Sequence, residues 1–213
     1  LVDLRDHGRS PHTELTDYPL MAEDVHALFQ KLELKQAVLA GHSMGGKTAM
    51  VFAQRWPELL KHLVVVDIGP RAYPIGDHAT IMEALLTSDL SAKTSRQEVE
   101  DNLERFIPEK GVVQFLMKSL YWVESGKLGW RFNVPTLQRC LPEIHGGIPP
   151  AVVKTPTLVI RGGKSPYIVR EDLPQIKEQF PNSRVETVEY AGHWVPAQAP
   201  EEVAAMLRGV AVG

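Results

Sequence analysis

The feature that most constrains this chain is a serine between glycines, Gly41-His42-Ser43-Met44-Gly45. A short apolar run, Ala37–Ala40, predicts a strand before it, and residues 47–53 have the spacing of a helix after it. Ser43 therefore falls on a sharp turn, and the flanking glycines leave room for the neighbouring strand and helix. The turn raises the hydroxyl above the sheet and brings the backbone N–H of Met44 to a helix N-terminus, where it can stabilise an oxyanion. The alternative interpretation is a glycine-rich turn without chemistry.

The same stretch also fits a second motif, the phosphate-binding P-loop. Gly41, Gly46, Lys47 and Thr48 satisfy the pattern G-x-x-x-x-G-K-[ST], which also occurs between a strand and a helix. Under this hypothesis Lys47 would bind phosphate, while Thr48 and Asp67 would lie at a magnesium ion. The motif alone cannot separate a serine nucleophile from a nucleotide site.

Composition narrows the function classes. The chain has 213 residues, 44% of them hydrophobic and 23% charged, which is ordinary for one globular domain with room for an inserted subdomain. A net charge of −3 gives no electrostatic case for nucleic acid, and no apolar run approaches the roughly 20 residues of a membrane span. A single cysteine, Cys140, excludes an internal disulfide and suits a reducing compartment. The histidines lack metal-ligand spacing, so we expect neither metal nor cofactor, and nothing indicates an oligomeric state.

Strands and helices are expected to alternate at both ends of the chain. The runs that predict strands are residues 1–4, 37–40, 63–67, 157–160 and 184–190. The stretches with helical spacing are residues 21–32, 47–55, 173–180 and 200–210. This alternation predicts the α/β class, with a doubly wound, mostly parallel sheet.

The middle of the chain has a different pattern. Between residues 69 and 150 we expect helices without a convincing strand, at residues 78–87, 95–106, 112–120 and 136–141. Ser95 followed by Glu98 fits a capping box at the start of the second of these helices. We therefore expect a helical cap of residues 69–150 inserted into a core of residues 1–68 and 151–213.

Acyl transfer by a serine needs a base to take its proton and a carboxylate to orient that base. Ser43, Asp67 and His193 occur in that chain order, and each follows a predicted strand, at the sheet edge where doubly wound folds place their sites. The loop after residue 160 is another place for the acid, but it offers only Ser165, and Asp172 further on fits a helix N-cap. We therefore assign the acid to Asp67.

Four stretches carry a resemblance to a known family: residues 3–11, 41–50, 66–70 and 191–194. With them the chain resembles the esterase branch of the α/β-hydrolase family, which includes bacterial short-acyl esterases, mitochondrial abhydrolase-domain proteins and ethanol acetyltransferases. The resemblance implies that the acid follows the strand that Asp67 ends, and it makes the P-loop match coincidental. It also favours a cytoplasmic or mitochondrial location.

The resemblance further implies a function. We expect a carboxylic-ester hydrolase for small or medium acyl groups that works through an acyl-enzyme, with transfer to alcohols as a second outcome. The family has further strands before Leu1 and a His-Gly loop that supplies a second oxyanion N–H. This chain has no such loop, and losing one oxyanion donor typically costs about 10²–10³ in rate. One alternative is therefore an inactive fragment. The others are a hydrolase-like receptor for small molecules and, remotely, a P-loop nucleotide binder.

Overall fold

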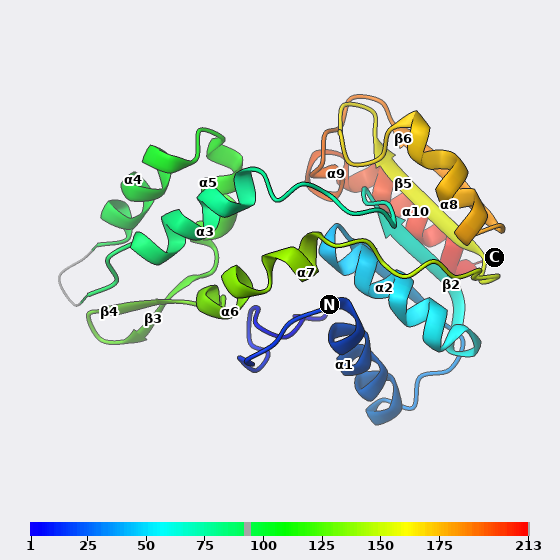
Figure 1. Cartoon of the computed structure of the whole chain (residues 1–213), viewed down its shortest axis with the longest axis horizontal. Coiled ribbons are helices and arrows are strands. Elements are labelled where there is room, and N and C mark those ends of the chain that lie inside the picture. The colour runs from blue at the N-terminus through cyan, green and yellow to red at the C-terminus, as the bar shows by residue number, and fades with distance from the viewer. Residues whose placement is uncertain (92–94, 213) are drawn as a thin grey trace. The chain divides into compact units, whose positions relative to one another are not determined.

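A computed structural model describes residues 1–91 and 95–212 of the chain (Figure 1). The chain divides into two compact units. The helical unit comprises Leu1–Asp17 and Tyr73–His145, and the sheet unit comprises Tyr18–Ala72 and Gly146–Gly213. The division groups the first 17 residues with the inserted segment, whereas the sequence assigned them to the core. The organisation as core and cap stays a prediction.

In the described part of the chain, the sheet unit is built on four parallel strands in the order β1-β2-β5-β6. Their bounds are Ala37–His42 (β1), Leu60–Val66 (β2), Thr157–Gly162 (β5) and Ser183–Val188 (β6). The apolar stretch from Leu63 to Val66 is buried, as expected for a central parallel strand covered on both faces. The predicted parallel sheet is confirmed.

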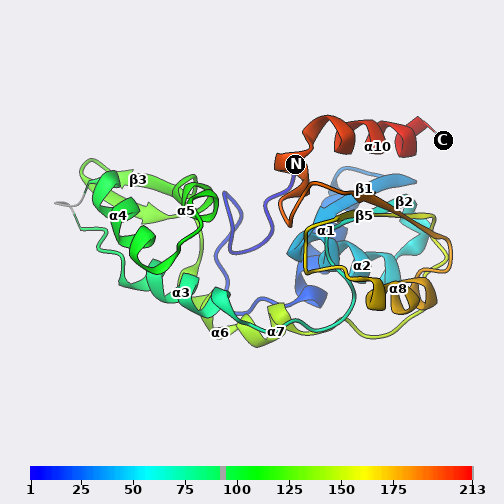
Figure 2. The same ribbon diagram turned by 90° about the horizontal axis from the view of Figure 1, so that it is seen from above.

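Helices cover both faces of this sheet. Figure 2 shows α10 (Pro200–Val212) over one face, with α2 (Met44–Arg55) and α8 (Leu173–Gln179) over the opposite one. α1 (Tyr18–Lys31) packs against α2. Short elements complete the unit, namely the 3₁₀ turns Pro57–Leu59 and Arg170–Asp172 and the helix α9 (Val195–Gln198).

The period-two alternation of the strands separates the two cores. Val64 and Ile160 pack with Val203 of α10 on one face, while Val159 packs with Ile176 of α8 on the other. Successive side chains of a strand point to opposite faces of the sheet, so each strand contributes to both layers. The doubly wound arrangement predicted from the sequence is confirmed.

Within its described residues, the helical unit contains five helices and a hairpin. The helices are α3 (Asp77–Thr87), α4 (Arg96–Phe106), α5 (Lys110–Met117), α6 (Val134–Arg139) and α7 (Leu141–His145). The predicted capping box is present, because the Ser95 hydroxyl accepts a hydrogen bond from Glu98 N and the Glu98 carboxylate accepts one from Ser95 N. Among the described residues, no helix is both long and apolar enough to cross a bilayer.

One prediction for this region was wrong. A two-stranded antiparallel hairpin of β3 (Leu120–Glu124) and β4 (Lys127–Trp130) lies where we expected no strand. The middle of β3, Tyr121 to Val123, is aromatic and β-branched, which favours a strand. Gly126 at φ 80° turns the chain between the strands, a conformation that glycine adopts without steric cost. The helix expected over residues 112–120 accordingly ends at Met117.

Residues 1–4 were also expected to form a strand, but they pair with no other strand among the described residues. The Asp3 carboxylate instead accepts a hydrogen bond from Arg9 N at 3.0 Å and closes a turn. The loop continues to Asp6, which is buried and accepts hydrogen bonds from Thr13 N and Asn133 Nδ2, both at 2.7 Å. These polar contacts, and not a β-ladder, hold the first residues in the helical unit.

Candidate active site

Ser43 lies at the turn between β1 and α2 in a backbone conformation that is rare for a residue other than glycine. Its φ is 53° and its ψ is −122°, and such conformations cost on the order of 1–3 kcal/mol. The turn is held because Ser43 N donates to Val66 O at 3.0 Å and Gly46 N donates to Ser43 O at 2.8 Å. Met44 is the first residue of α2, at the positive end of the helix dipole, where the sequence placed an oxyanion donor.

The close approach of strand and helix depends on two of the glycines in the motif. A Cβ atom at Gly41 would lie 2.1 Å from Gly45 O, and one at Gly46 would lie 2.6 Å from Ile68 Cγ2. At Gly45, a Cβ atom would meet no described atom within 4 Å. From the sequence we expected Gly45 to leave room for the neighbouring strand, but the residue that must lack a side chain for this contact is Gly46.

The three candidate catalytic side chains meet in the sheet unit. His193 Nε2 lies 3.0 Å from Ser43 Oγ, and His193 Nδ1 lies 2.8 Å from Asp67 Oδ2. Since a carboxylate only accepts, Nδ1–H donates to Asp67, and Nε2 is left to accept the hydroxyl proton of Ser43. Asp67 is fully buried, whereas the His193 side chain is 18% exposed. Hydrogen bonds thus connect the three side chains, from Ser43 through His193 to the buried Asp67.

Asp67 receives donors from the loop after β5 as well. Gly162 N donates to its Oδ1 at 2.9 Å, and Ser165 Oγ donates to its Oδ2. Asp67 itself has φ 52° and directly follows β2. A buried carboxylate is stable only when hydrogen bonds replace its lost hydration, and His193 is the third donor.

The rival position for the acid is occupied by residues with other partners. Ser165, in the loop after β5, supports Asp67 and does not replace it. Asp172 accepts from Arg71 Nε at 2.7 Å and from Val169 N at 2.9 Å. It precedes α8, but its side chain makes no hydrogen bond to that helix, so the expected N-cap contact is absent.

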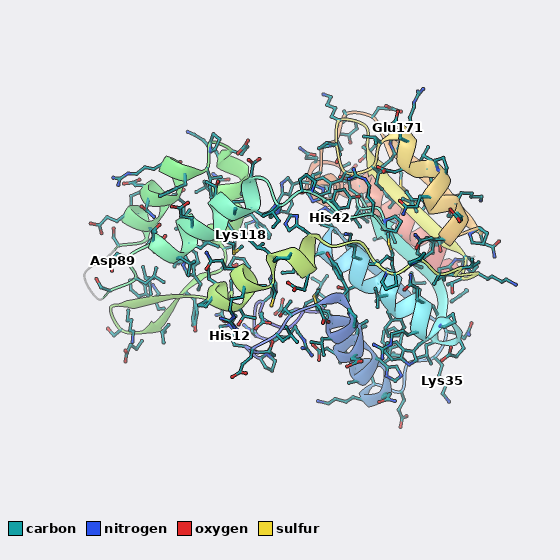
Figure 3. All side chains as sticks on the ribbon, in the orientation of Figure 1. His12, Lys35, His42, Asp89, Lys118 and Glu171 are labelled. Carbon is teal, nitrogen blue, oxygen red and sulfur yellow. The ribbon has the colours of Figure 1, made fainter. Side chains whose placement is uncertain are left out.

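The rings of Tyr167, His42 and Trp194 lie against His193, and none of them had been given a role from the sequence. The ring of Tyr167 stacks on the imidazole, with centroids 3.8 Å apart and planes at 19°. On another side, His42 donates from Nε2 to His193 O at 2.8 Å (Figure 3 labels His42). Burial lowers the pKa of His42, so its ring is neutral at neutral pH and Nε2 carries the proton that this bond requires.

Lys47 and Thr48, the residues of the P-loop pattern, point into the protein. The Lys47 side chain is buried, and its Nζ donates to Arg71 O at 2.7 Å and to Gly146 O. Thr48 Oγ1 donates to Met44 O at 3.0 Å. Both polar groups serve internal acceptors, so these residues do not form a phosphate cradle.

Known proteins share this architecture. A solved structure, a marine microorganism esterase, superposes with a TM-score of 0.94 at 36% identity and covers 98% of this chain and 82% of its own. Esterase YbfF of Escherichia coli is 35% identical over 97% of this chain and 80% of its own length. The sn-1-specific diacylglycerol lipase ABHD11 of Danio rerio is 37% identical over 93% of this chain, which spans 64% of that relative.

The family follows from these matches. A model of the α/β hydrolase family fits residues 1–206, which is almost the whole chain. The resemblance inferred from the sequence is therefore confirmed, together with the fold class it implied. This chain belongs to the α/β hydrolase family.

Proposed function

We propose that this protein is a serine-dependent carboxylic-ester hydrolase, with Ser43 as the nucleophile, His193 as the general base and Asp67 as the group that orients the base. One observation carries the proposal, the continuous hydrogen-bonded path from Ser43 Oγ through both nitrogens of His193 to a buried carboxylate. The esterase relatives support hydrolysis of carboxylic esters.

The proposed reaction proceeds in two halves. Ser43 Oγ attacks the carbonyl carbon of the ester while its proton passes to His193 Nε2, and the electron pair of the C=O bond moves to the oxygen. The N–H of Met44 donates to that oxyanion at the helix N-terminus. His193 then gives its proton to the departing alkoxide, which leaves as an alcohol, and the acyl group remains on Ser43. Water completes hydrolysis, whereas an alcohol in its place would complete an acyl transfer.

Strain at Ser43 fits this role. A residue held at φ 53° next to a helix start persists only where the surroundings determine it, and such conformations gather at functional sites. The three donors to Asp67 similarly hold the acid in one orientation without any movement during the reaction. Preorganisation of this kind supports a catalyst more than a simple binder.

A fluorophosphonate probe and a series of chromogenic esters test the proposal together. The probe should label Ser43, and Ser43→Ala should abolish both labelling and turnover. Ser91→Ala, at an exposed serine, serves as the matched control and should leave both unchanged. We expect small and medium acyl esters to be the best substrates. Labelling of Ser43→Ala at the full rate would contradict the nucleophile, and labelling without turnover of any ester would favour a binding protein.

A further inference from the structure

Lys47 is a buried lysine that has no role in the proposed reaction. It lies one turn after Ser43 on α2, and only 1% of its surface is exposed. Its Nζ donates to the backbone carbonyls of Arg71 and Gly146 and lies 5.4 Å from the centre of the Tyr18 ring. Burying an amine is costly unless its donors are satisfied, so these contacts compensate for a substantial desolvation cost.

The two carbonyls belong to chain segments that run side by side, residues 70–72 and 146–148. Ile148 N donates to Pro70 O at 2.9 Å. A Cβ atom on Gly147 would lie 3.2 Å from Ala72 N and 3.3 Å from Pro70 O, which is tighter than ordinary packing. Lys47 therefore binds a pair of segments that are already in close contact, and a small shift in either would be transmitted to the other.

The first of these segments begins at the proposed acid. Asp67 turns the chain out of β2 with φ 52°, and the next residue, Ile68, is buried against Gly46. Gly46 allows the first turn of α2 to approach Ile68, and Lys47 reaches from the same turn to Arg71 O. Two neighbouring residues of the helix thus hold both ends of the stretch that follows Asp67.

We propose that Lys47 is a positioning residue that fixes the segment after Asp67 to the helix beginning beside Ser43, and so keeps Asp67 in line with His193. The inference rests on the proposed function for its kinetic readout. The Gly-Lys pair that resembles a P-loop is explained here as an internal brace between nucleophile and acid. A misplacement of about 1 Å in a catalytic group can cost about 10²-fold in rate, so the brace has a measurable effect.

Lys47→Met removes the donors and keeps the length of the side chain. We expect kcat to fall by about 10- to 100-fold while KM changes by less than about twofold, because the variant alters the alignment of the triad and leaves substrate contacts intact. Lys177→Met is the matched control, since the Lys177 amine also donates to a backbone carbonyl, Ser183 O at 2.9 Å, but is exposed. That control should behave as the wild type.

Gly147→Ala tests the contact between residues 146–148 and residues 70–72 without removing the charge of Lys47. It also provides a test if Lys47→Met does not fold. The added methyl group should push residues 146–148 away from residues 70–72 and lower kcat by about 3- to 10-fold. Gly209→Ala is its control, because a Cβ atom there would meet no described atom within 4 Å.

A spectroscopic readout separates this inference from the proposed function. The His193 Nδ1 proton, hydrogen-bonded to Asp67, should give a far-downfield proton resonance that requires no turnover. We expect that resonance to broaden or shift in Lys47→Met and to stay unchanged in Lys177→Met. An unchanged resonance and an unchanged kcat in Lys47→Met, or equal kcat values in Gly147→Ala and Gly209→Ala, would overturn the inference. Failure of the wild type to cleave esters would instead overturn the proposed function.

Discussion

The titration of Lys47 gives a quantitative prediction about stability. Burial, and to a smaller extent the charge of Arg71, lower the pKa of Lys47 from 10.5 to about 8 in the folded protein. In the unfolded chain the amine regains its ordinary pKa. Between these two values the unfolded state binds more protons than the folded state, so the free energy of unfolding increases with pH. This contribution to stability is complete above the unfolded pKa and is lost as the pH falls through the folded one.

The magnitude follows from the size of the shift. Each pKa unit corresponds to about 1.36 kcal/mol, so the whole window contributes about 3 kcal/mol. Between about pH 7.5 and about pH 9.5, the contribution should change by about 2 kcal/mol, because the folded-state amine loses most of its proton there. Arg71, the charged side chain that acts on Lys47, is itself paired with Asp172 at 2.7 Å.

Urea denaturation followed by circular dichroism measures this effect. The free energy of unfolding is determined for the wild type and for Lys47→Met at both pH values, and the difference between the two proteins isolates the lysine. We expect that difference to shift by about 2 kcal/mol in favour of the wild type at the higher pH. Lys177→Met, with its exposed amine, should show no such shift. A difference that is independent of pH would refute the reasoning, as it would mean that Lys47 keeps its ordinary pKa.

Three further predictions concern Asp67, Ser165 and Asp6. Asp67→Asn should lower kcat by about 10⁴-fold, because the imidazole loses its orienting partner, whereas Asp172→Asn should change kcat by less than about tenfold; kinetics showing the reverse would move the acid to the loop after β5. Ser165→Ala removes a donor to the buried Asp67 carboxylate and should reduce kcat/KM by about 10- to 100-fold, and an unchanged value would make this bond incidental. Burial alone would raise the pKa of Asp6, but hydrogen bonds from Thr16, Thr13 and Asn133 outweigh it and lower the pKa. The stability that this carboxylate contributes is present above the unfolded pKa and is lost as the pH falls through the folded one, so the advantage of the wild type over Asp6→Asn in urea denaturation should shrink in acid.

Local signals were sufficient to predict most of the sheet unit. The apolar run before Ser43, the helical spacing after it and the buried stretch ending at Val66 each depend on residues close together in sequence. The capping box at Ser95 could also be predicted, because its two residues, Ser95 and Glu98, are three positions apart. Choosing Ser43, Asp67 and His193 needed one further rule, that parallel strands end at a common edge, and the structure places the three side chains within hydrogen-bond distance.

The remaining features depend on contacts between distant residues. Ser165 is 98 positions from Asp67, and no local pattern shows that its hydroxyl reaches that carboxylate. The stacking of Tyr167 on His193 likewise follows from how two loops meet. The hairpin was missed because the helical spacing expected over residues 112–120 reaches the first residue of β3, Leu120, and the turn at Gly126 was not used as a signal. Lys47 also fitted a phosphate-binding motif as an alternative, because sequence alone does not show which way a side chain points.

The register between β1 and β2 has a consequence for how such a site can change. His42 is paired with Val66, and Ser43 and Asp67 directly follow the ends of β1 and β2, with Ser43 N donating to Val66 O. The proposed nucleophile and acid therefore leave the sheet at the same level of two neighbouring strands, and a slip of one residue between β1 and β2 would displace one relative to the other. His193, by contrast, is carried by a loop after β6, whose length and course can vary without disturbing the ladder. Insertions in that loop can therefore move the imidazole without disturbing the sheet. The positions of Ser43 and Asp67 are instead fixed by the pairing of β1 with β2.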